Sequence, residues 1–276
     1  MKFTSGIPAP KLLETEEDIL DALRQCQATD LLAVDTETTG KLKNEHGVYL
    51  RDDIMRDSVL YMGLCPNEEV RYFVPFRHLR KFKGVLEDES ITKALHNFKF
   101  DAHRLANAGI YLAGPVADSL IMDWLYDEDQ RENRHSLDAC VWDYFGIPMA
   151  KYNDIVRGDP RAYEPGHEMW EQFLDYGTLD AWATRKLVLH LMDELEKIDI
   201  WKDGATSMLD LYWRLEEPQL KCLWDMERRG ILLDSELLSS KNELLTKAMN
   251  EAAGAIASMV GRPVNPNSTK QATALL

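Results

Sequence analysis

The first part of the chain alternates short apolar runs with polar turns, a pattern typical of a β-sheet. Residues 31–34 form an apolar run that leads into a polar turn at Gly40, so we expect a buried strand there. Two further runs, 58–64 and 70–75, flank the turn-like sequence CPNEE and predict an antiparallel meander with the first strand. Another strand is expected to end in the sequence ITKALHN. Together these runs predict a mixed sheet of about five strands.

The rest of the chain has the apolar spacing of helices. Thr15 is a residue type that caps helices, and the acids that follow it suit a first turn, which predicts a helix at 15–26. Gly109 marks the end of a helix predicted at 98–107. Further helices are expected at 120–126, 137–145, 169–198, 208–229 and 235–260, with loops at 77–83 and 152–166. The chain becomes wholly helical beyond Trp201, which predicts a domain boundary near residue 203.

Composition is that of a soluble globular protein, with 45% hydrophobic and 29% charged residues. The net charge of −15 argues against a tight stand-alone nucleic-acid-binding module. It does not exclude an enzyme that meets phosphates through bound divalent cations. The cysteines are scattered without a CxxC pair, so they predict neither a zinc site nor a disulfide framework: Cys26, Cys65, Cys140 and Cys222. No signal-peptide core or apolar stretch of about 18 residues is present, and we expect a cytoplasmic protein without membrane contact.

Acidic residues stand at spacings that suit metal binding in three short segments. Asp35 and Glu37 lie two apart in a predicted strand, so their side chains share one face. The alternative for this pair is two solvated acids where a strand meets a turn.

The second and third segments each pair a polar residue with an aspartate four positions later. Asn97 and Asp101 share a face at a helix start; alternatively, Asn97 caps the helix and Asp101 is a surface acid near its positive end. Tyr176 and Asp180 also share a helix face, for which a structural hydrogen bond is the alternative.

In order along the chain, DTET, HNFKFD and YGTLDA resemble the three exonuclease motifs of the DEDD superfamily in its tyrosine subclass. Each motif is similar to the 3′-5′ proofreading domain of family A DNA polymerases, as are the connecting sequences VRYFVP and NRHSLDACVWDYFGI. The resemblance covers residues 28–200. It implies an α/β, ribonuclease H-like fold, in which a mixed sheet is flanked by helices and followed by an α-helical segment.

The resemblance also implies a two-metal mechanism, in which two cations about 3.5–4 Å apart clamp the attacking and leaving oxygens at phosphorus. Carboxylate ligands suit Mg²⁺, with Mn²⁺ as the alternative. Asp35, Glu37 and Asp180 would hold the metal that activates water, and Asp35 and Asp101 would hold the second. Tyr176 would hydrogen-bond the attacking water, because a phenol with a pKa of about 10 is a poor base at neutral pH.

Substrate contacts are also implied by the resemblance. Asn97 and Phe100 occupy positions that touch the terminal nucleotides, Phe100 by stacking on a base, although a core aromatic explains Phe100 equally well. His96 and Lys99 are candidate phosphate neighbours, with ordinary surface roles as the alternative. The family's wedge residue, just after the first motif, has no clear counterpart in this sequence; Lys41 and Leu42 are both candidates.

The C-terminal part, with the sequences LEEPQLKCLWDMERRGILLD and GRPVNPNSTKQATALL, resembles the start of the polymerase module of family A enzymes. An amphipathic helical hairpin explains its spacing equally well. We therefore expect an exonuclease domain at 1–203 and a truncated helical start of the polymerase thumb at 204–276. No polymerase activity is expected from this chain alone, and the remaining polymerase module would lie in the same chain or a partner chain.

The leading hypothesis is an exonuclease that removes mispaired nucleotides from a single-stranded DNA 3′ end or primer terminus during DNA replication, in a bacterial cell or a phage-infected host. An RNA-trimming exonuclease of the ribonuclease D type shares all three motifs and is the nearest alternative. A binding module with an inactive nuclease site is the alternative from another class. It is disfavoured because Asp35, Glu37, Asp101, Tyr176 and Asp180 are all present.

Overall fold

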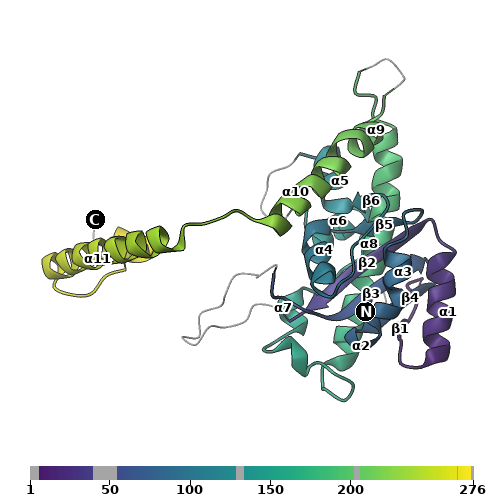
Figure 1. Ribbon diagram of the computed structural model, residues 1–276, viewed down its shortest axis with the longest axis horizontal. Coiled ribbons are helices and arrows are strands. Elements are labelled where there is room, and N and C mark those ends of the chain that lie inside the picture. The colour runs from purple at the N-terminus through teal and green to yellow at the C-terminus, as the bar shows by residue number, and fades with distance from the viewer. Residues whose placement is uncertain (1–5, 40–54, 129–133, 202–205, 266, 275–276) are drawn as a thin grey trace. The chain divides into compact units, whose positions relative to one another are not determined.

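The computed structural model (Figure 1) describes residues 6–39, 55–128, 134–201, 206–265 and 267–274. Contacts within the chain divide it into two compact units, Met1–Arg228 and Arg229–Leu276. Residues 208–228, which the sequence analysis assigned to the start of a polymerase module, pack within the first unit. The division of the chain near residue 203 into exonuclease and polymerase segments stays a prediction.

A six-stranded mixed sheet forms the centre of the first unit. The strand order is β1 (Pro10–Leu12), β4 (Val70–Pro75), β3 (Val59–Asn67), β2 (Leu31–Thr38), β5 (Thr92–Leu95) and β6 (Val116–Asp118). The predicted antiparallel meander is confirmed, because β3 pairs antiparallel with both β2 and β4. The other pairings are parallel. The prediction of about five strands missed β1 and β6, which are edge strands of three residues each and too short to show an alternating pattern.

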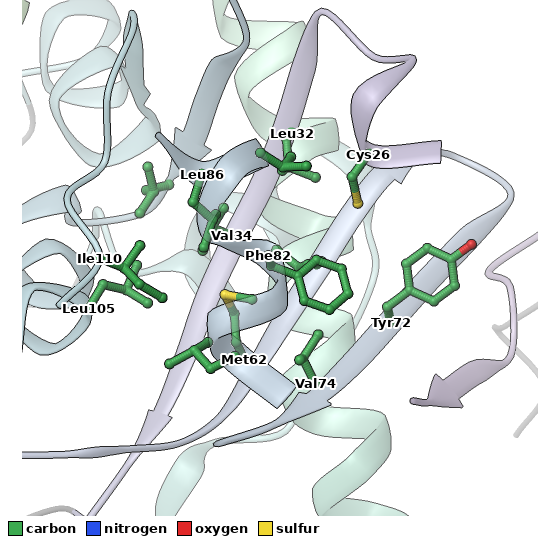
Figure 2. Packing of buried hydrophobic residues seen from close by; sticks show 14 of the residues in the cluster. Cys26, Leu32, Val34, Met62, Tyr72, Val74, Phe82, Leu86, Leu105 and Ile110 are labelled. Atoms are coloured by element: carbon green, nitrogen blue, oxygen red, sulfur yellow. The ribbon is translucent and has the colours of Figure 1, made fainter. Parts of the chain in front are cut away.

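One face of the sheet packs against helices from the first half of the chain. These are α1 (Glu16–Gln27), α3 (Lys83–Leu86) and α4 (Phe98–Asn107). Figure 2 shows Leu32 and Val34 of β2 in this layer, together with Met62, Phe82 and Leu105. The predicted cap of α1 is confirmed, because Thr15 accepts a hydrogen bond from the Asp18 amide at 3.2 Å.

The opposite face of the sheet packs against α5 (Ser119–Tyr126), α6 (Leu137–Phe145) and the long helix α8 (Trp170–Glu196). Leu31 and Ala33 of β2 belong to this layer. Since side chains alternate along a strand, Asp35 and Glu37 continue onto the α8 face, whereas Thr36 continues onto the α4 face.

Both predicted loops contain short helices. The basic stretch forms α2 (Phe76–Leu79), η1 (Arg80–Phe82) and the start of α3. These helices were missed because the buried residues Leu79 and Phe82 lie between charged ones that dominate the local composition. The stretch 152–166 contains α7 (Tyr152–Ile155) and η2 (Pro160–Ala162). The predicted helix at 208–229 is α9 (Met208–Leu211), the π-helical turn η3 (Tyr212–Glu216) and α10 (Glu217–Arg229).

The second unit contains α11 (Ser235–Val260) and α12 (Thr269–Thr273). The bounds of α11 match the prediction, with Asp234 capping its start and Gly261, at φ 74°, following its last residue. In the described part of the chain, no helix combines the length and apolarity that crossing a bilayer requires.

Candidate metal centre

Three carboxylates meet where β2 and α8 face each other. Asp35 and Glu37 come from alternate positions of β2, and Asp180 comes from α8. One carboxylate oxygen from each residue lies within 4.8 Å of the others. Glu37 and Asp180 are almost fully buried, at 5% and 8% exposure. The predicted sharing of one face by Asp35 and Glu37 is therefore confirmed, and the alternative of solvated acids at a turn is wrong.

Two glycines allow α8 to approach the sheet closely enough for this meeting. A Cβ atom on Gly63 of β3 would lie 2.2 Å from the carbonyl oxygen of Gly177. A Cβ on Gly177 would lie 2.7 Å from Phe73 and 3.0 Å from the Glu37 carboxylate. The backbone of α8 at Gly177 is therefore in direct contact with β3 at Gly63 and lies close to the Glu37 side chain.

Asp101 lies beside this cluster of three and is bonded to a residue on the other face of β2. The Thr36 hydroxyl donates a hydrogen bond of 2.6 Å to Asp101 Oδ1, and Asp101 is 2% exposed. The negative charge of Asp35 also acts on the Asp101 carboxyl. The alternative of a surface acid is therefore wrong for Asp101. The sequence analysis did not assign Thr36 a role, because a threonine in a strand carries no such signal by itself.

Burial and crowding disfavour ionisation of all four acids when no cation is present. Burial raises the pKa of Asp35 to about 7. Burial, with repulsion from Asp35 and Asp180, raises the pKa of Glu37 well above its usual value. The pKa values of Asp101 and Asp180 are raised in the same way, first by burial and then by Asp35.

The donor set fits divalent cations. Among the residues that the structure describes, no lysine or arginine forms an ion pair with Asp35, Glu37 or Asp180. Buried carboxylates without a basic partner are stabilised by a cation, and hard oxygen ligands are those that divalent cations such as Mg²⁺ prefer. The alternative that Tyr176 and Asp180 form only a structural hydrogen bond does not account for this cluster.

Tyr176 lies one turn before Asp180 in α8 and is half-buried. Burial and the charges of Asp180 and Glu37 raise the pKa of its hydroxyl, so the group stays protonated near neutral pH. A hydrogen bond from Tyr176 in turn favours the ionised form of Asp180, although burial outweighs it. Tyr176 is therefore suited to donating a hydrogen bond at the centre.

Asn97 occupies the N-cap position of α4, but its side chain makes no capping hydrogen bond. The cap comes instead from Asp118, whose carboxylate accepts hydrogen bonds from the Asn97 and Phe98 amides at 3.0 and 2.8 Å. Asn97 has a positive φ of 73° and is exposed. The alternative that Asn97 caps the helix is thus wrong. Asp118 precedes a predicted helix, but its link to α4 exists only in the folded chain.

Phe100 is only partly buried, and the guanidinium of Arg104 lies 3.7 Å from the centre of its ring. Arg104 is itself buried and bonded to Asp57 at 2.8 Å. The ring is therefore held in place by a cation on one side and is not a core aromatic. Its predicted contact with substrate stays a prediction, as does that of Asn97.

Several of the described basic residues near the motifs and in the predicted basic loop already have partners. Lys99 forms an ion pair of 2.5 Å with Glu227, and Arg77 and Lys81 pair with acids at the start of the chain, Glu14 and Glu16. Burial lowers the pKa of His96 to about 4, which leaves its ring neutral. The predicted wedge residues, Lys41 and Leu42, lie outside the described residues.

A cavity of about 350 Å³ opens beside Tyr176 and Asp180. It is lined on its other sides by α6 and the segment that follows, including Asp138, Lys151 and Tyr152. The Tyr152 ring makes an edge contact with the Tyr176 ring, with centroids 6.3 Å apart. Tyr152 was predicted to lie in a loop, and its place beside Tyr176 could not be predicted because the two residues are distant in the sequence.

Comparison with known proteins identifies the family. The model of the 3′-5′ exonuclease domain of family A DNA polymerases matches residues 10–196. DNA polymerase I of Pseudomonas aeruginosa is 26% identical over 270 residues, which cover 92% of this chain and 27% of that protein. The chain spans about a fifth to a quarter of the length of the first curated relatives that it matches.

Solved structures show the same fold. The polymerase domain of Pol1 from M. smegmatis, in complex with DNA primer-template and dNTP, aligns with a TM-score of 0.65 and 21% identity, over 97% of this chain and 40% of that one. Escherichia coli RNase D, an exoribonuclease, aligns with a TM-score of 0.58 and 20% identity, over 80% of this chain and 51% of that one. These likenesses confirm the ribonuclease H-like fold, and at such identities they do not distinguish substrates. The match over residues 10–196 shows that this chain belongs to the 3′-5′ exonuclease family of family A DNA polymerases.

Proposed function

We propose that this chain is a proofreading exonuclease, which removes nucleotides from the 3′ end of DNA as part of a family A DNA polymerase. The observation that carries the proposal is the buried cluster of Asp35, Glu37 and Asp180, with Asp101 beside it, in a chain of this family. Four crowded carboxylates with raised pKa values are unfavourable without cations and well suited to holding two of them.

Asp35, Glu37 and Asp180 would hold one divalent cation, and Asp35 and Asp101 would hold the other. Mg²⁺ is the proposed ion, and Mn²⁺ the alternative. When bound, the ions lower the pKa of water and neutralise charge on the phosphate. Attack of a water oxygen on the terminal phosphorus breaks the bond to the preceding O3′ oxygen. The products are a nucleoside 5′-monophosphate and a strand with a new 3′-hydroxyl, which takes up a proton.

The remaining residues would orient the reactants. The Tyr176 hydroxyl, which stays protonated, would hydrogen-bond the attacking water and fix its position. Asn97 and Phe100 at the start of α4 would contact the terminal nucleotides, with the Phe100 ring presented for stacking on a base. Tyr152, which lines the cavity next to Tyr176, is a further candidate for contact with a nucleotide.

DNA is proposed as the substrate because the curated relatives include DNA polymerases I. The remaining polymerase module is the proposed partner, in the same chain or another. In the second unit no residue of α11 is buried, although the helix carries several large apolar side chains: Leu237, Leu238, Leu244, Leu245 and Met249. A helix of this kind is stabilised when another protein surface covers its apolar residues.

The test uses 5′-labelled oligonucleotides, single-stranded DNA, 3′-recessed duplex DNA and a matched RNA, each with Mg²⁺ or EDTA. We expect a ladder that shortens from the 3′ end of DNA, requires the metal and is abolished in the Asp35→Ala, Glu37→Ala double variant. The Glu68→Ala, Glu69→Ala double variant removes the same charge from an exposed turn and should retain full activity.

Faster shortening of RNA than of DNA would replace the proposal with the ribonuclease D-like alternative. No shortening of either substrate by a folded, Mg²⁺-binding protein would contradict the proposal for this chain by itself. Repeating the assay with the polymerase module added would then distinguish an incomplete site from an inactive one.

A further inference from the structure

The outer edge of β6 is closed by side chains. Ala117 pairs with Ala94 of β5, and backbone groups of Val116 and Asp118 are bonded on the other side. The Tyr212 hydroxyl accepts a hydrogen bond from the Asp118 amide and donates one to the Val116 carbonyl, both at 2.8 Å. Glu217 accepts a hydrogen bond from the Val116 amide at 3.1 Å. Two side chains from η3 and α10 thus occupy the place of a neighbouring strand.

Strand β6, whose edge Tyr212 and Glu217 hold, ends in Asp118, and Asp118 orients α4. Asp118 is 1% exposed. Its carboxylate accepts hydrogen bonds from the Asn97 and Phe98 amides, and from the Leu120 amide at 3.0 Å. It therefore caps α4 and α5 together. Because α4 has no cap of its own, the position of its first turn depends on Asp118.

The first turn of α4 carries the residues that matter at the metal centre. Asp101 accepts its hydrogen bond from Thr36 there, and Phe100 stands beside it. The C-terminal half of α10 also contacts α4. Trp224 packs on His103 with ring centroids 5.9 Å apart, and Glu227 bonds His103 at 2.9 Å. The segment 207–228 therefore contacts α4 directly through α10 and indirectly through β6.

We propose that Tyr212 is a positioning residue for the exonuclease site. Its hydroxyl fixes the β6 edge, β6 fixes Asp118, and Asp118 fixes the start of α4, where Asp101 enters the metal centre. Tyr212 is fully buried and belongs to the same hydrophobic cluster as residues of α8, so it acts through Asp118 and not by contact with substrate. The inference rests on the proposed function. It assigns to the exonuclease a residue in the segment that resembles the polymerase module.

The test compares the full chain with its Tyr212→Phe variant, which keeps the buried ring and removes only the hydroxyl. Tyr111→Phe removes the same atom from an exposed ring and serves as the control. The first readout is kcat on single-stranded DNA as a function of Mg²⁺, well below the melting temperature of either protein. The second is hydrogen exchange of the Asn97 and Phe98 amides, which requires no activity.

For Tyr212→Phe we expect kcat to fall about 10- to 100-fold, because displacing a reacting group by about 1 Å has an effect of that size. The Mg²⁺ concentration for half-maximal rate should rise, and the Asn97 and Phe98 amides should exchange faster. A residue that only stabilised the fold would leave the Mg²⁺ requirement unchanged. Asp118→Asn should cause the same changes, and the double variant should be little worse than either single one.

An unchanged Mg²⁺ requirement, or unchanged exchange at Asn97 and Phe98, would overturn the proposal. If Tyr212→Phe does not fold, Glu217→Ala loosens the same strand edge without altering the Tyr212 ring, and the same two readouts apply to it. An inactive wild-type chain would contradict the proposed function alone, because the exchange measurement would still test the link from Tyr212 to α4.

Discussion

Glu37 shows how a buried carboxylate depends on its surroundings. It is 5% exposed, and its neighbours in the metal centre, Asp35 and Asp180, are also acidic. Moving an unpaired carboxylate out of water is costly, and like charges add to the cost. The folded chain tolerates this cluster in two ways, by protonation at low pH and by cation binding at higher pH. Each has a measurable consequence.

In the absence of metal, we expect the stability of the first unit to fall as pH rises through about 7. The folded-state pKa of Asp35 is raised to about 7, above the value of about 3.9 expected in the unfolded chain. The folded protein therefore binds more protons between these two values, and the stabilisation is lost as pH rises. Melting temperatures in EDTA from pH 5.5 to 8 would show this fall.

Two companion measurements separate this cause from general pH sensitivity. Asp35→Asn should flatten the decline, since the substituted side chain does not titrate. Mg²⁺ at pH 8 should raise the melting temperature of the wild type, because a ligand that binds only the folded state stabilises it. A melting temperature in EDTA that is constant or rises between pH 5.5 and 8 would show that burial does not raise the pKa values of these acids.

Tyr176→Phe should lower kcat by about 100-fold or more, the loss that follows removal of one oriented hydrogen-bond donor. The burial of Tyr176 keeps its hydroxyl protonated, so its removal should leave the shape of the pH–rate profile unchanged up to pH 9. Tyr126→Phe, a substitution on a more exposed ring of α5, is the control. Loss of a basic limb from the profile of the Tyr176 variant would instead assign the hydroxyl a role as a base.

At the scale of elements, the spacing between α8 and the sheet determines the site. Gly63 and Gly177 leave room for the helix backbone to touch the strand, and a larger residue at either position meets backbone or buried side chains. Since Tyr176 and Asp180 flank Gly177 on this helix, displacement of α8 moves both away from Glu37.

Gly177→Ala should therefore destabilise the first unit by about 1–3 kcal/mol, the usual range for overpacking. It should also weaken Mg²⁺ binding. Its Cβ would lie 2.7 Å from Phe73 and 3.0 Å from Glu37, whereas a Cβ on Gly84 of α3 meets nothing within 4 Å. Gly84→Ala should be neutral or stabilising by up to about 1 kcal/mol, because alanine favours a helix over glycine. The free energy of unfolding of both variants, measured in urea, tests this difference. Equal free energies of unfolding for the two variants would contradict the prediction.

At the scale of the whole molecule, the charge of −15 limits how the chain meets DNA. Two of the described basic residues are already paired with acids, Lys99 with Glu227 and Arg77 with Glu14. With this excess of negative charge on the chain, bound metal ions should provide much of the local positive charge that meets phosphates.

We expect weak binding of single-stranded DNA in EDTA and clearly tighter binding with Mg²⁺, measured by fluorescence anisotropy with a phosphorothioate oligonucleotide that resists cleavage. The salt dependence should be shallow, because bound metal ions rather than protein cations would meet the phosphates. The Asp35→Ala, Glu37→Ala variant should lose the Mg²⁺ effect. Equally tight binding by wild type in EDTA and Mg²⁺ would point to a basic DNA-binding surface elsewhere.

The prediction of elements from sequence succeeded where a pattern was long enough to repeat. The helices at 137–145 and 235–260 were located to the residue, and the β2–β3–β4 meander was correctly paired. The strands β1 and β6 were missed because each contributes three residues to an edge. The helices within 76–86 were missed because their buried apolar residues alternate with prominent charged ones.

The types and spacing of the acidic residues were sufficient to predict the chemistry of the centre. The two-residue repeat of a strand places Asp35 and Glu37 on one face of that strand. The pitch of a helix places Tyr176 and Asp180 on one face of the helix. Both repeats are local properties of the backbone, so they can be predicted from spacing alone. The tertiary structure alone decided how near these faces come, through the contact of Gly177 with Gly63. It also gave Asp118 its second role, as the cap of α4. Such distances join segments far apart in the chain, and local spacing contains no information about their packing.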